Sequence, residues 1–344
     1  MSSEPTRGET ERHDIQQDGD EVLARQAAES MAADIGFDEA AVGEIGIVAT
    51  ELASNIRKHA DSGELAVSQL TDGDRAGIRI ESFDVGPGIV NVDAAFADGT
   101  STAGSLGGGL GAVNRLMHQL TVAAPGEPDF GTKIVADRWI RADHEPQPSC
   151  PLSFGAASRP AANETVNGDS FVIKRWDDHV LVGVIDGLGH GDEAHKASNA
   201  ATEYIETHYD NAVASIFAGT ERACRGTRGV VMALARFDWT DNTVTVGTVG
   251  NINHKTNDES DLTVIPRRGV VGNNGPSPKI TQSEWHPTDR LVLFSDGIDS
   301  HWEFSTVWAN NDESATVTAR RLLDQYSKPH DDATVLVVSN SDDV

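Results

Sequence analysis

Aspartates in the second half of this 344-residue chain stand where they could bind metal ions. They lie in four short segments: Asn167-Gly-Asp169, Asp186-Gly187, Asp296-Gly297 and Asp331-Asp332. Carboxylate and carbonyl oxygens are the ligands that Mg²⁺ and Mn²⁺ prefer. Two such ions side by side can generate hydroxide and hold the oxygens of a phosphate group. The set therefore predicts metal-dependent hydrolysis of a phosphate ester.

The first two aspartates are predicted to face each other across a β-hairpin. Strands at 171–176 and 179–185 that turn at residues 177–178 place Asp169 directly opposite Asp186. Opposite side chains in such a pair have Cβ atoms roughly 5 Å apart, where two like charges destabilise a sheet. A divalent cation would neutralise them.

The remaining aspartates are also predicted to lie at strand ends. Asp296 follows a strand at 291–294, and Asp331 comes shortly before a strand at 334–338. The alternative is that Asp-Gly pairs at strand ends only make turns. That would suffice for one of them, but four in this order favour an oxygen-ligand cage for two ions.

A second set of candidate residues, in the first half, fits a nucleotide. Asp84 ends a predicted strand and could accept a hydrogen bond from the exocyclic amine of adenine. The turn that contains Gly86 and Gly88 lets the backbone approach a flat ring. A glycine-rich run then precedes an apolar helix at 113–120, so its amides could hold phosphates. Its glycines are Gly107, Gly109 and Gly111.

A predicted helix at 39–59 would face this pocket. Apolar residues at spacings of three and four give it a buried stripe of Ile45, Val48, Leu52 and Ile56. Glu51 and Asn55 share an adjacent face, one turn apart. Asn55 offers an oxygen ligand to Mg²⁺, and Glu51 could act as a base or hold a water molecule.

The pattern of elements predicts two domains of α/β (α+β) class. The first half alternates helices, from about residue 21, with strands at 64–70, 77–83, 119–123 and 132–139. Three prolines between 142 and 153 mark a linker. The second half is strand-rich, with further strands at 230–238 and 244–249 and helices at 195–208 and 314–326. We expect a disordered or loosely attached acidic tail at 1–19, domains at 20–142 and 152–341, and a linker at 143–151.

The composition restricts the partners. With 27 Lys and Arg against 54 Asp and Glu, the net charge of −27 disfavours nucleic acid and anionic membranes. Lysine is scarce among the cations, which favours a cytosol of high salt over a merely acidic protein. The two cysteines, Cys150 and Cys224, form no CxxC pair. No apolar run is long enough to span a bilayer and no signal peptide is evident, so we expect a cytoplasmic protein.

In their order, the first-half segments resemble the GHKL, or Bergerat, ATPase fold. Residues 51–55 match its N box, 84–89 its G1 box, 107–111 its G2 box, and Gly131-Thr132 its closing Gly-Thr. The likeness is to the RsbT-type switch kinases, through the segments at 84–89, 98–102, 115–117 and 131–133, and covers about residues 20–139. It implies a two-layer α/β sandwich that binds ATP with one Mg²⁺, uses Thr132 in the pocket, and has serine/threonine kinase activity. A sensor histidine kinase is disfavoured because His13 lies in a polar, aperiodic segment.

The second half resembles the PPM-type serine/threonine phosphatases of the SpoIIE and RsbX group. The matching segments are 153–156, 167–169, 186–191, 227–229, 249–251, 295–297 and 331–334. The likeness implies a β-sandwich flanked by helices that binds two Mg²⁺ or Mn²⁺ ions. Their ligands would be Asp169, Asp186, Asp296, Asp331 and the carbonyl of Gly187, with Asp332 as an alternative. His190 would be either an acid near the leaving group or a structural histidine.

Together the two resemblances imply a partner-switching regulator. Its kinase-like and phosphatase domains would act on serine or threonine of STAS-type regulatory proteins, and further switch proteins would be additional partners. In the alternative, the first half is a non-catalytic module that uses ATP to dock a partner or gate the phosphatase. A phosphatase for small metabolites is disfavoured by the lack of a separate substrate-recognition domain.

Overall fold

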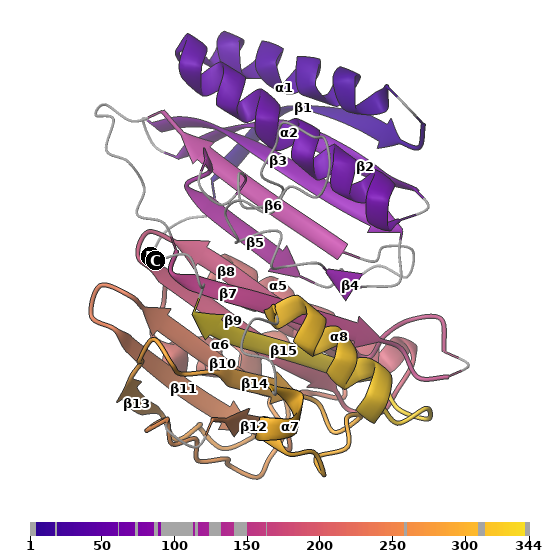
Figure 1. Ribbon diagram of the computed structural model, residues 1–344, viewed down its shortest axis with the longest axis vertical. Coiled ribbons are helices and arrows are strands. Elements are labelled where there is room, and N and C mark those ends of the chain that lie inside the picture. The colour runs from indigo at the N-terminus through magenta and orange to yellow at the C-terminus, as the bar shows by residue number, and fades with distance from the viewer. Residues whose placement is uncertain are drawn as a thin grey trace.

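Two β-sheets organise the molecule (Figure 1). The computed structural model describes residues 5–17, 19–60, 62–72, 75–85, 89–90, 113, 116–123, 132–140, 150–162, 164–257, 260–308 and 314–340. The larger sheet has ten strands in the order β1-β2-β3-β6-β5-β8-β9-β10-β11-β13, and the smaller has five in the order β12-β14-β15-β7-β4. Together with the helices described in the next paragraphs, these sheets confirm the predicted mixed α and β fold class.

Five neighbouring strands of the larger sheet come from the first half of the chain, and the five that follow them come from the second half. From the first half come β1 (Thr6–Ile15), β2 (Ser62–Asp72), β3 (Arg75–Val85), β5 (Gln119–Ala123) and β6 (Thr132–Trp139). From the second half come β8 (Asp169–Trp176), β9 (His179–Gly187), β10 (Val230–Asp238), β11 (Thr243–Val249) and β13 (Thr281–Glu284). The smaller sheet comprises β4 (Ile89–Val90), β7 (Leu152–Arg159), β12 (Asn253–Thr256), β14 (Leu291–Phe294) and β15 (Ala333–Asn340).

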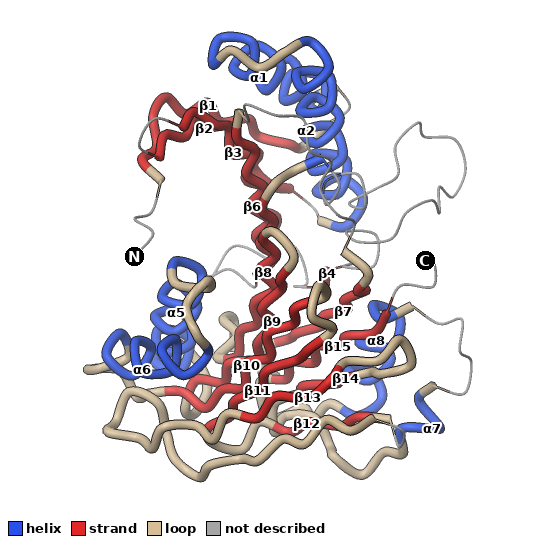
Figure 2. Tube along the Cα trace, turned by 90° about the vertical axis from the view of Figure 1, so that its left-hand side faces the viewer, coloured by secondary structure: helices blue, strands red, loops and turns tan. Residues whose placement is uncertain are grey.

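Two helices, α1 (Asp20–Ile35) and α2 (Glu39–His59), cover one face of β1, β2 and β3 (Figure 2). The bounds of α2 are those predicted, and Asp38 caps its start by accepting a hydrogen bond from the Ala41 amide. The predicted stripe is buried, with Ile45, Val48 and Leu52 at 0% exposure. The first half is therefore the two-layer α/β sandwich that the periodicity predicts.

The prediction of a disordered or loosely attached tail at 1–19 is wrong for the described residues 6–15. Residues Thr6–Ile15 form β1, which pairs with β2, and Ile15 is fully buried. The segment has no apolar periodicity because most of its side chains are exposed, and backbone hydrogen bonds hold it. Ion pairs from Arg7 to Glu81 and from Arg12 to Glu64 attach it further.

The helix predicted at 113–120 ends early. Val113 and Leu116 are helical, and the Met117 amide donates to the Val113 carbonyl at 3.1 Å. Gln119 already begins β5, which pairs with β6. The apolar run continues past the helix because Leu120 and Val122 are buried side chains of a strand. A short apolar run alone does not distinguish a helix from a strand.

In the second half the two sheets pack face to face, and helices cover their outer faces. Alternate residues of β9 separate accordingly: Val180, Val182 and Val184 lie in the core between the sheets, whereas Leu181 and Ile185 lie in a second apolar cluster with residues of α5 and α6. The helices are α5 (Asp192–Thr207) and α6 (Val213–Ala223) on the larger sheet, α8 (Ala315–Tyr326) on the smaller, and the short α7 (Phe304–Val307). In the described part of the chain, no helix is long and apolar enough to cross a membrane.

Backbone pairing joins the two halves, which the sequence did not predict. Strand β5 pairs antiparallel with β8, from Gln119 opposite Trp176 to Ala123 opposite Val172. In the smaller sheet, Ile89 of β4 lies opposite Ala157 of β7. Figure 2 shows the larger sheet running without a break from β1 into the second half. Most of the predicted linker, up to residue 149, lies outside the described residues.

Candidate functional site

The β8–β9 hairpin places the first two candidate ligands as predicted. It turns at Asp177 and Asp178, and Asp169 pairs with Asp186. Asp169 is 4% exposed and accepts a hydrogen bond from Ser295 Oγ at 2.6 Å. Burial raises the pKa of both Asp169 and Asp186, and the charge of Asp169 raises the pKa of Asp186 further. Two acids held this close repel each other when both are ionised.

The other three carboxylates lie around this pair. Asp296 follows β14, and Asp331 and Asp332 precede β15, which contacts both β8 and β9. Their charges raise the pKa of Asp186, after burial and Asp169. The carboxyl groups of Asp296 and Asp331 are within hydrogen-bonding reach of each other. The structure thus gathers all five aspartates that the sequence predicts as ligands.

The residues present fit a hard divalent cation. An added Cβ at Gly187 would lie 2.0 Å from the Ala194 carbonyl oxygen. Only glycine therefore fits at this position, where its backbone carbonyl is a candidate ligand. The buried Oδ2 of Asp332 makes no well-formed hydrogen bond, although the Gly168 amide lies nearby. Among the described residues, however, no three acidic, imidazole or thiol side chains converge on one point as they stand. The donor set matches Mg²⁺ or Mn²⁺, and ligation would draw these carboxylates closer.

A chain of hydrogen bonds among neighbouring residues holds Asp169 in position. The Ser295 hydroxyl that donates to Asp169 accepts from the Thr334 amide at 3.0 Å. The Thr334 and Ser158 hydroxyls lie 2.6 Å apart, and Asn167 Nδ2 donates to Ser158 Oγ at 2.6 Å. Ser158 was missed by the sequence reasoning, because a lone serine in a buried strand carries no local signal.

Two histidines lie beside the cluster. His190, the candidate acid, is exposed and hydrogen-bonds to Glu164 Oε1 at 2.6 Å. Burial raises the pKa of Asp332, and the charge of a protonated His190 opposes this rise slightly. His195, in the first turn of α5, contacts the Asn167 carbonyl through Nδ1 at 2.7 Å. Neither Glu164 nor His195 was singled out from the sequence, since each becomes significant only through contacts distant along the chain.

In the first half, the structure brings together Asp84 and Thr132. They are directly opposite on β3 and β6, and Thr132 donates hydrogen bonds to the Asp84 carboxyl. Burial, opposed by these hydrogen bonds, raises the pKa of Asp84 to about 6. A Cβ at Gly63 would meet both Ile56 of α2 and the backbone of Asp84, so the end of α2 packs against the end of β3.

The helix α2 side of the predicted pocket is also buried. Glu51 is 8% exposed, and burial raises its pKa. The Nδ2 atom of Asn55 is buried and has no hydrogen-bond partner among the described residues. An unpaired polar atom of this kind is what a bound ligand would satisfy. The remaining pocket residues, Gly86, Gly88, Gly107, Gly109 and Gly111, lie outside the described residues, so their roles stay predictions.

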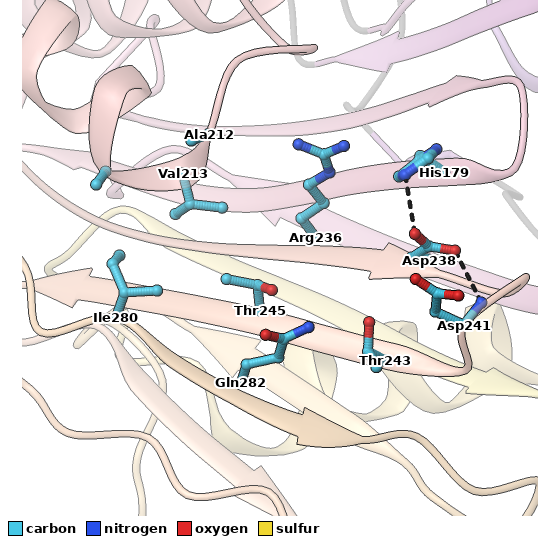
Figure 3. A pocket seen from close by; sticks show the side chains of 11 residues that line it. His179, Ala212, Val213, Arg236, Asp238, Asp241, Thr243, Thr245, Ile280 and Gln282 are labelled. Carbon is cyan, nitrogen blue, oxygen red and sulfur yellow. Dashed lines mark hydrogen bonds and ion pairs between the residues drawn. The ribbon is translucent and has the colours of Figure 1, made fainter.

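Two hollows in the described surface lie apart from the carboxylate cluster and from the predicted nucleotide pocket. One, of about 280 Å³, opens at the start of α6, where His179 Nε2 lies 3.1 Å from Asp238 Oδ2 (Figure 3). The other, of about 430 Å³, lies where β5 and β8 join the two halves. No predicted site residue lines either hollow.

Comparison with known proteins assigns the first half. Residues 18–136 match the family described as histidine kinase-like ATPase domain. The chain is 37% identical over 128 residues to the serine/threonine-protein kinase RsbT of Bacillus subtilis (strain 168), covering 37% of this chain and 94% of RsbT. The chain belongs to the RsbT family through this domain. We call this half the RsbT-like domain. The match confirms the resemblance that the N, G1 and G2 boxes indicated.

The other half is similar to a phosphatase. The chain is 24% identical over 139 residues to the phosphoserine phosphatase RsbX of Bacillus subtilis (strain 168), covering 40% of this chain and 69% of RsbX. A crystal structure of RsbX in complex with magnesium superposes with a TM-score of 0.50 at 19% identity, covering 55% of this chain and 96% of RsbX. The chain therefore fuses an RsbT kinase-like domain to an RsbX-like phosphatase domain.

Proposed function

We propose that the RsbX-like domain is a metal-dependent phosphatase that removes phosphate from serine or threonine of STAS-type regulatory proteins. The observation that carries this proposal is the buried carboxylate cluster, with Asp169 facing Asp186 and Asp296, Asp331 and Asp332 around them. A cluster of acids that raise one another's pKa is stable in its ionised form only with cations bound.

Each residue has a part in this reaction. Asp169, Asp186, Asp296 and Asp331 would hold two Mg²⁺ or Mn²⁺ ions, with the Gly187 carbonyl, and Asp332 would support or replace one ligand. Such ions supply hydroxide and neutralise charge on the phosphate. Ser295 orients Asp169, and Asn251 Nδ2 orients Asp296 through a hydrogen bond of 2.7 Å. His190, exposed beside the cluster, would donate a proton to the leaving oxygen.

For the RsbT-like domain we propose ATP binding with one Mg²⁺ and transfer of phosphate to a partner of the same class. Asp84, held by Thr132, would accept the adenine amine, and Asn55 would bind the Mg²⁺ ion. Glu51 would act as the base, a role that suits a buried carboxyl with a raised pKa. The chain would thus add and remove the same modification. The domain limits of 20–142 and 152–341 and a cytoplasmic location remain part of this proposal.

The test of the phosphatase proposal is phosphate release from a phosphorylated STAS protein as Mn²⁺ or Mg²⁺ is added. Asp186→Asn should reduce the rate by roughly a hundredfold or more, because the paired ligands can no longer assemble. ATP binding by the same variant serves as the control and should be unchanged. Metal-independent release, or equal rates in both proteins, would contradict the proposal.

A second function for the RsbT-like domain, ATP-dependent gating of the phosphatase, is favoured by the pairing between domains. Strand β4, five residues after Asp84, lies against β7, and Ser158 of β7 belongs to the hydrogen-bond chain behind Asp169. If occupancy of the pocket shifts β4, it alters this chain. ATP should then change the rate at which the parent hydrolyses a small phosphate ester. It should leave the rate of Asp84→Asn unchanged. Equal rates with and without ATP in the parent would exclude gating.

A further inference from the structure

A polar cleft of about 430 Å³ lies on the larger sheet where the two domains meet, and we call it the inter-domain cleft. It is on the face opposite α1 and α2, since Ile78 and Ile80 of β3 pack in the core beneath those helices, whereas Arg79 and Glu81 of the same strand line the cleft. Its walls are β3, β6 and β5 of the RsbT-like domain and β8 and the end of α5 of the RsbX-like domain. Pockets of this size accommodate small molecules.

Glu81 and Glu206, two of the acidic residues that line the cleft, are paired with cations. Glu81 binds Arg7 at 2.7 Å, and Lys133 binds Glu206 of α5 at 3.2 Å, which links the two domains. At the buried base, Arg79 makes two hydrogen bonds to Asp137, of 2.6 and 2.7 Å. In a chain of net charge −27, the cleft is unusual because its lining cations outnumber its lining acids. The cations are Arg7, Arg75, Arg79, Lys133 and Lys174, and the acids are Glu81, Asp177, Glu206 and Asp210.

Lys174 is the most buried of these cations without an ion pair among the described residues. The residue is 5% exposed, and its ammonium lies 4.6 Å from the centre of the Tyr209 ring. Within the described part of the chain, it has no hydrogen-bond acceptor and no ion pair. An ammonium carries three donors, and because Lys174 lines the cleft, these donors are open to an acceptor bound there. Burial lowers the pKa of Lys174 to about 8, although Asp137 and Glu206 oppose the shift.

We propose that the inter-domain cleft binds a small oxyanion, a phosphate or carboxylate group, with Lys174 as its main contact. Such a group presents several acceptor oxygens to the unsatisfied ammonium. Arg75 offers a second positive charge at the rim, where its guanidinium lies 4.9 Å from the Trp139 ring. Arg75 belongs to the RsbT-like domain and Lys174 to the RsbX-like domain, so both domains contribute cations to the cleft. This site is distinct from the carboxylate cluster and from the proposed nucleotide pocket.

The test is anion binding to the full chain with a chelator present, so that the proposed metal site stays empty. Potassium phosphate, sulfate and malonate are titrated against KCl at constant ionic strength. Binding is followed by melting temperature and by tryptophan fluorescence, because Trp139 and Trp176 line the cleft. At least one anion should stabilise the parent saturably beyond KCl. Phosphate and sulfate alone would indicate a tetrahedral oxyanion, and malonate as well would indicate a general dianion site.

Lys174→Met keeps the length of the side chain but removes the donors, and it should weaken the anion's affinity by about tenfold or more. Lys196→Met is the matched control, because Lys196 is exposed on α5 and pairs only locally, with Glu193. It should bind as the parent does. If Lys174→Met fails to fold, Arg75→Gln provides the second variant and should weaken binding severalfold. The absence of an anion-specific effect in the parent, or equal affinity in the parent and the cleft variants, would overturn the proposal.

Discussion

At the level of single residues, the carboxyl of Asp84 is held between two opposing influences. Burial favours its neutral form, and hydrogen bonds from Thr132 favour its ionised form, which leaves its pKa at about 6 against an ordinary 3.8. In the folded protein the acid therefore keeps its proton to higher pH than in the unfolded chain. Its contribution to stability is present below pH 3.8 and is lost as the pH rises through about 6. The ionised form, which best accepts a hydrogen bond from the adenine amine, thus predominates only above about pH 6.

We therefore expect ATP affinity to fall as the pH is lowered below about 6, approaching tenfold per pH unit as Asp84 takes up its proton. Thr132→Val removes one hydrogen bond that favours the ionised form of Asp84. The pH at which ATP affinity begins to fall should therefore be higher in this variant. Calorimetric titration with ATP at several pH values measures both proteins, and the difference between them cancels the titration of ATP itself. Identical profiles would show that Asp84 does not contact the nucleotide. Asp84→Asn should abolish binding.

At the level of elements, the contact between β9 and α5 sets the position of Gly187, whose carbonyl is a proposed metal ligand. Gly187 ends β9 and meets the Ala194 carbonyl of α5, a backbone group that cannot rotate away. Helix α5 continues to Glu206, which pairs with Lys133 of the RsbT-like domain. One helix thus contacts the carboxylate cluster at its start and the neighbouring domain at its end.

Gly187→Ala should lower the free energy of unfolding by about 1–3 kcal/mol, because the new Cβ forces α5 away from β9. Phosphatase activity should fall with it. The matched control is Gly43→Ala in α2, where an added Cβ meets nothing within 4 Å. That change should stabilise by up to about 1 kcal/mol, since alanine is the better helix former. Urea unfolding measures all three proteins, and equal midpoints for Gly187→Ala and the parent would contradict this account of the loop.

Elements with strong apolar patterns were predictable, and those held by backbone pairing were not. The bounds of α2, β5, β6, β10 and β14 match the prediction. The predicted turn at residues 177–178 set the β8–β9 register, and with it the pairing of Asp169 with Asp186. Strand β1 and the pairing of β5 with β8 depend on main-chain hydrogen bonds, which any side chain permits. Ser158 and His195 act through partners far along the chain, so no local spacing reveals them.

At the level of the whole molecule, the excess of acidic residues dominates. The charge of −27 is spread over both domains, and only seven of the 27 cations are lysine. Surface charges in dilute buffer repel over about 10 Å or more, whereas molar salt reduces this range to about 3 Å. The buried pair of Arg79 and Asp137 is shielded from solvent and should respond little.

We expect the melting temperature to rise as KCl increases from millimolar toward molar concentrations, with most of the gain where screening changes fastest. Differential scanning calorimetry across that range measures it. Sucrose at matched osmolality is the control, since it stabilises without screening charge. A melting temperature that is flat or falls with KCl, or a gain that sucrose reproduces, would reject an adaptation to high salt.

The pairing of β5 with β8 also bears on whether the two activities can exist as separate polypeptides. The five paired positions satisfy backbone groups that would otherwise be open strand edges on both domains. Such edges invite association with any other strand, including a second copy of the same domain. A chain divided between residues 140 and 150 would therefore release two aggregation-prone pieces. Fusion thus keeps the two domains at equal abundance and protects each from self-assembly.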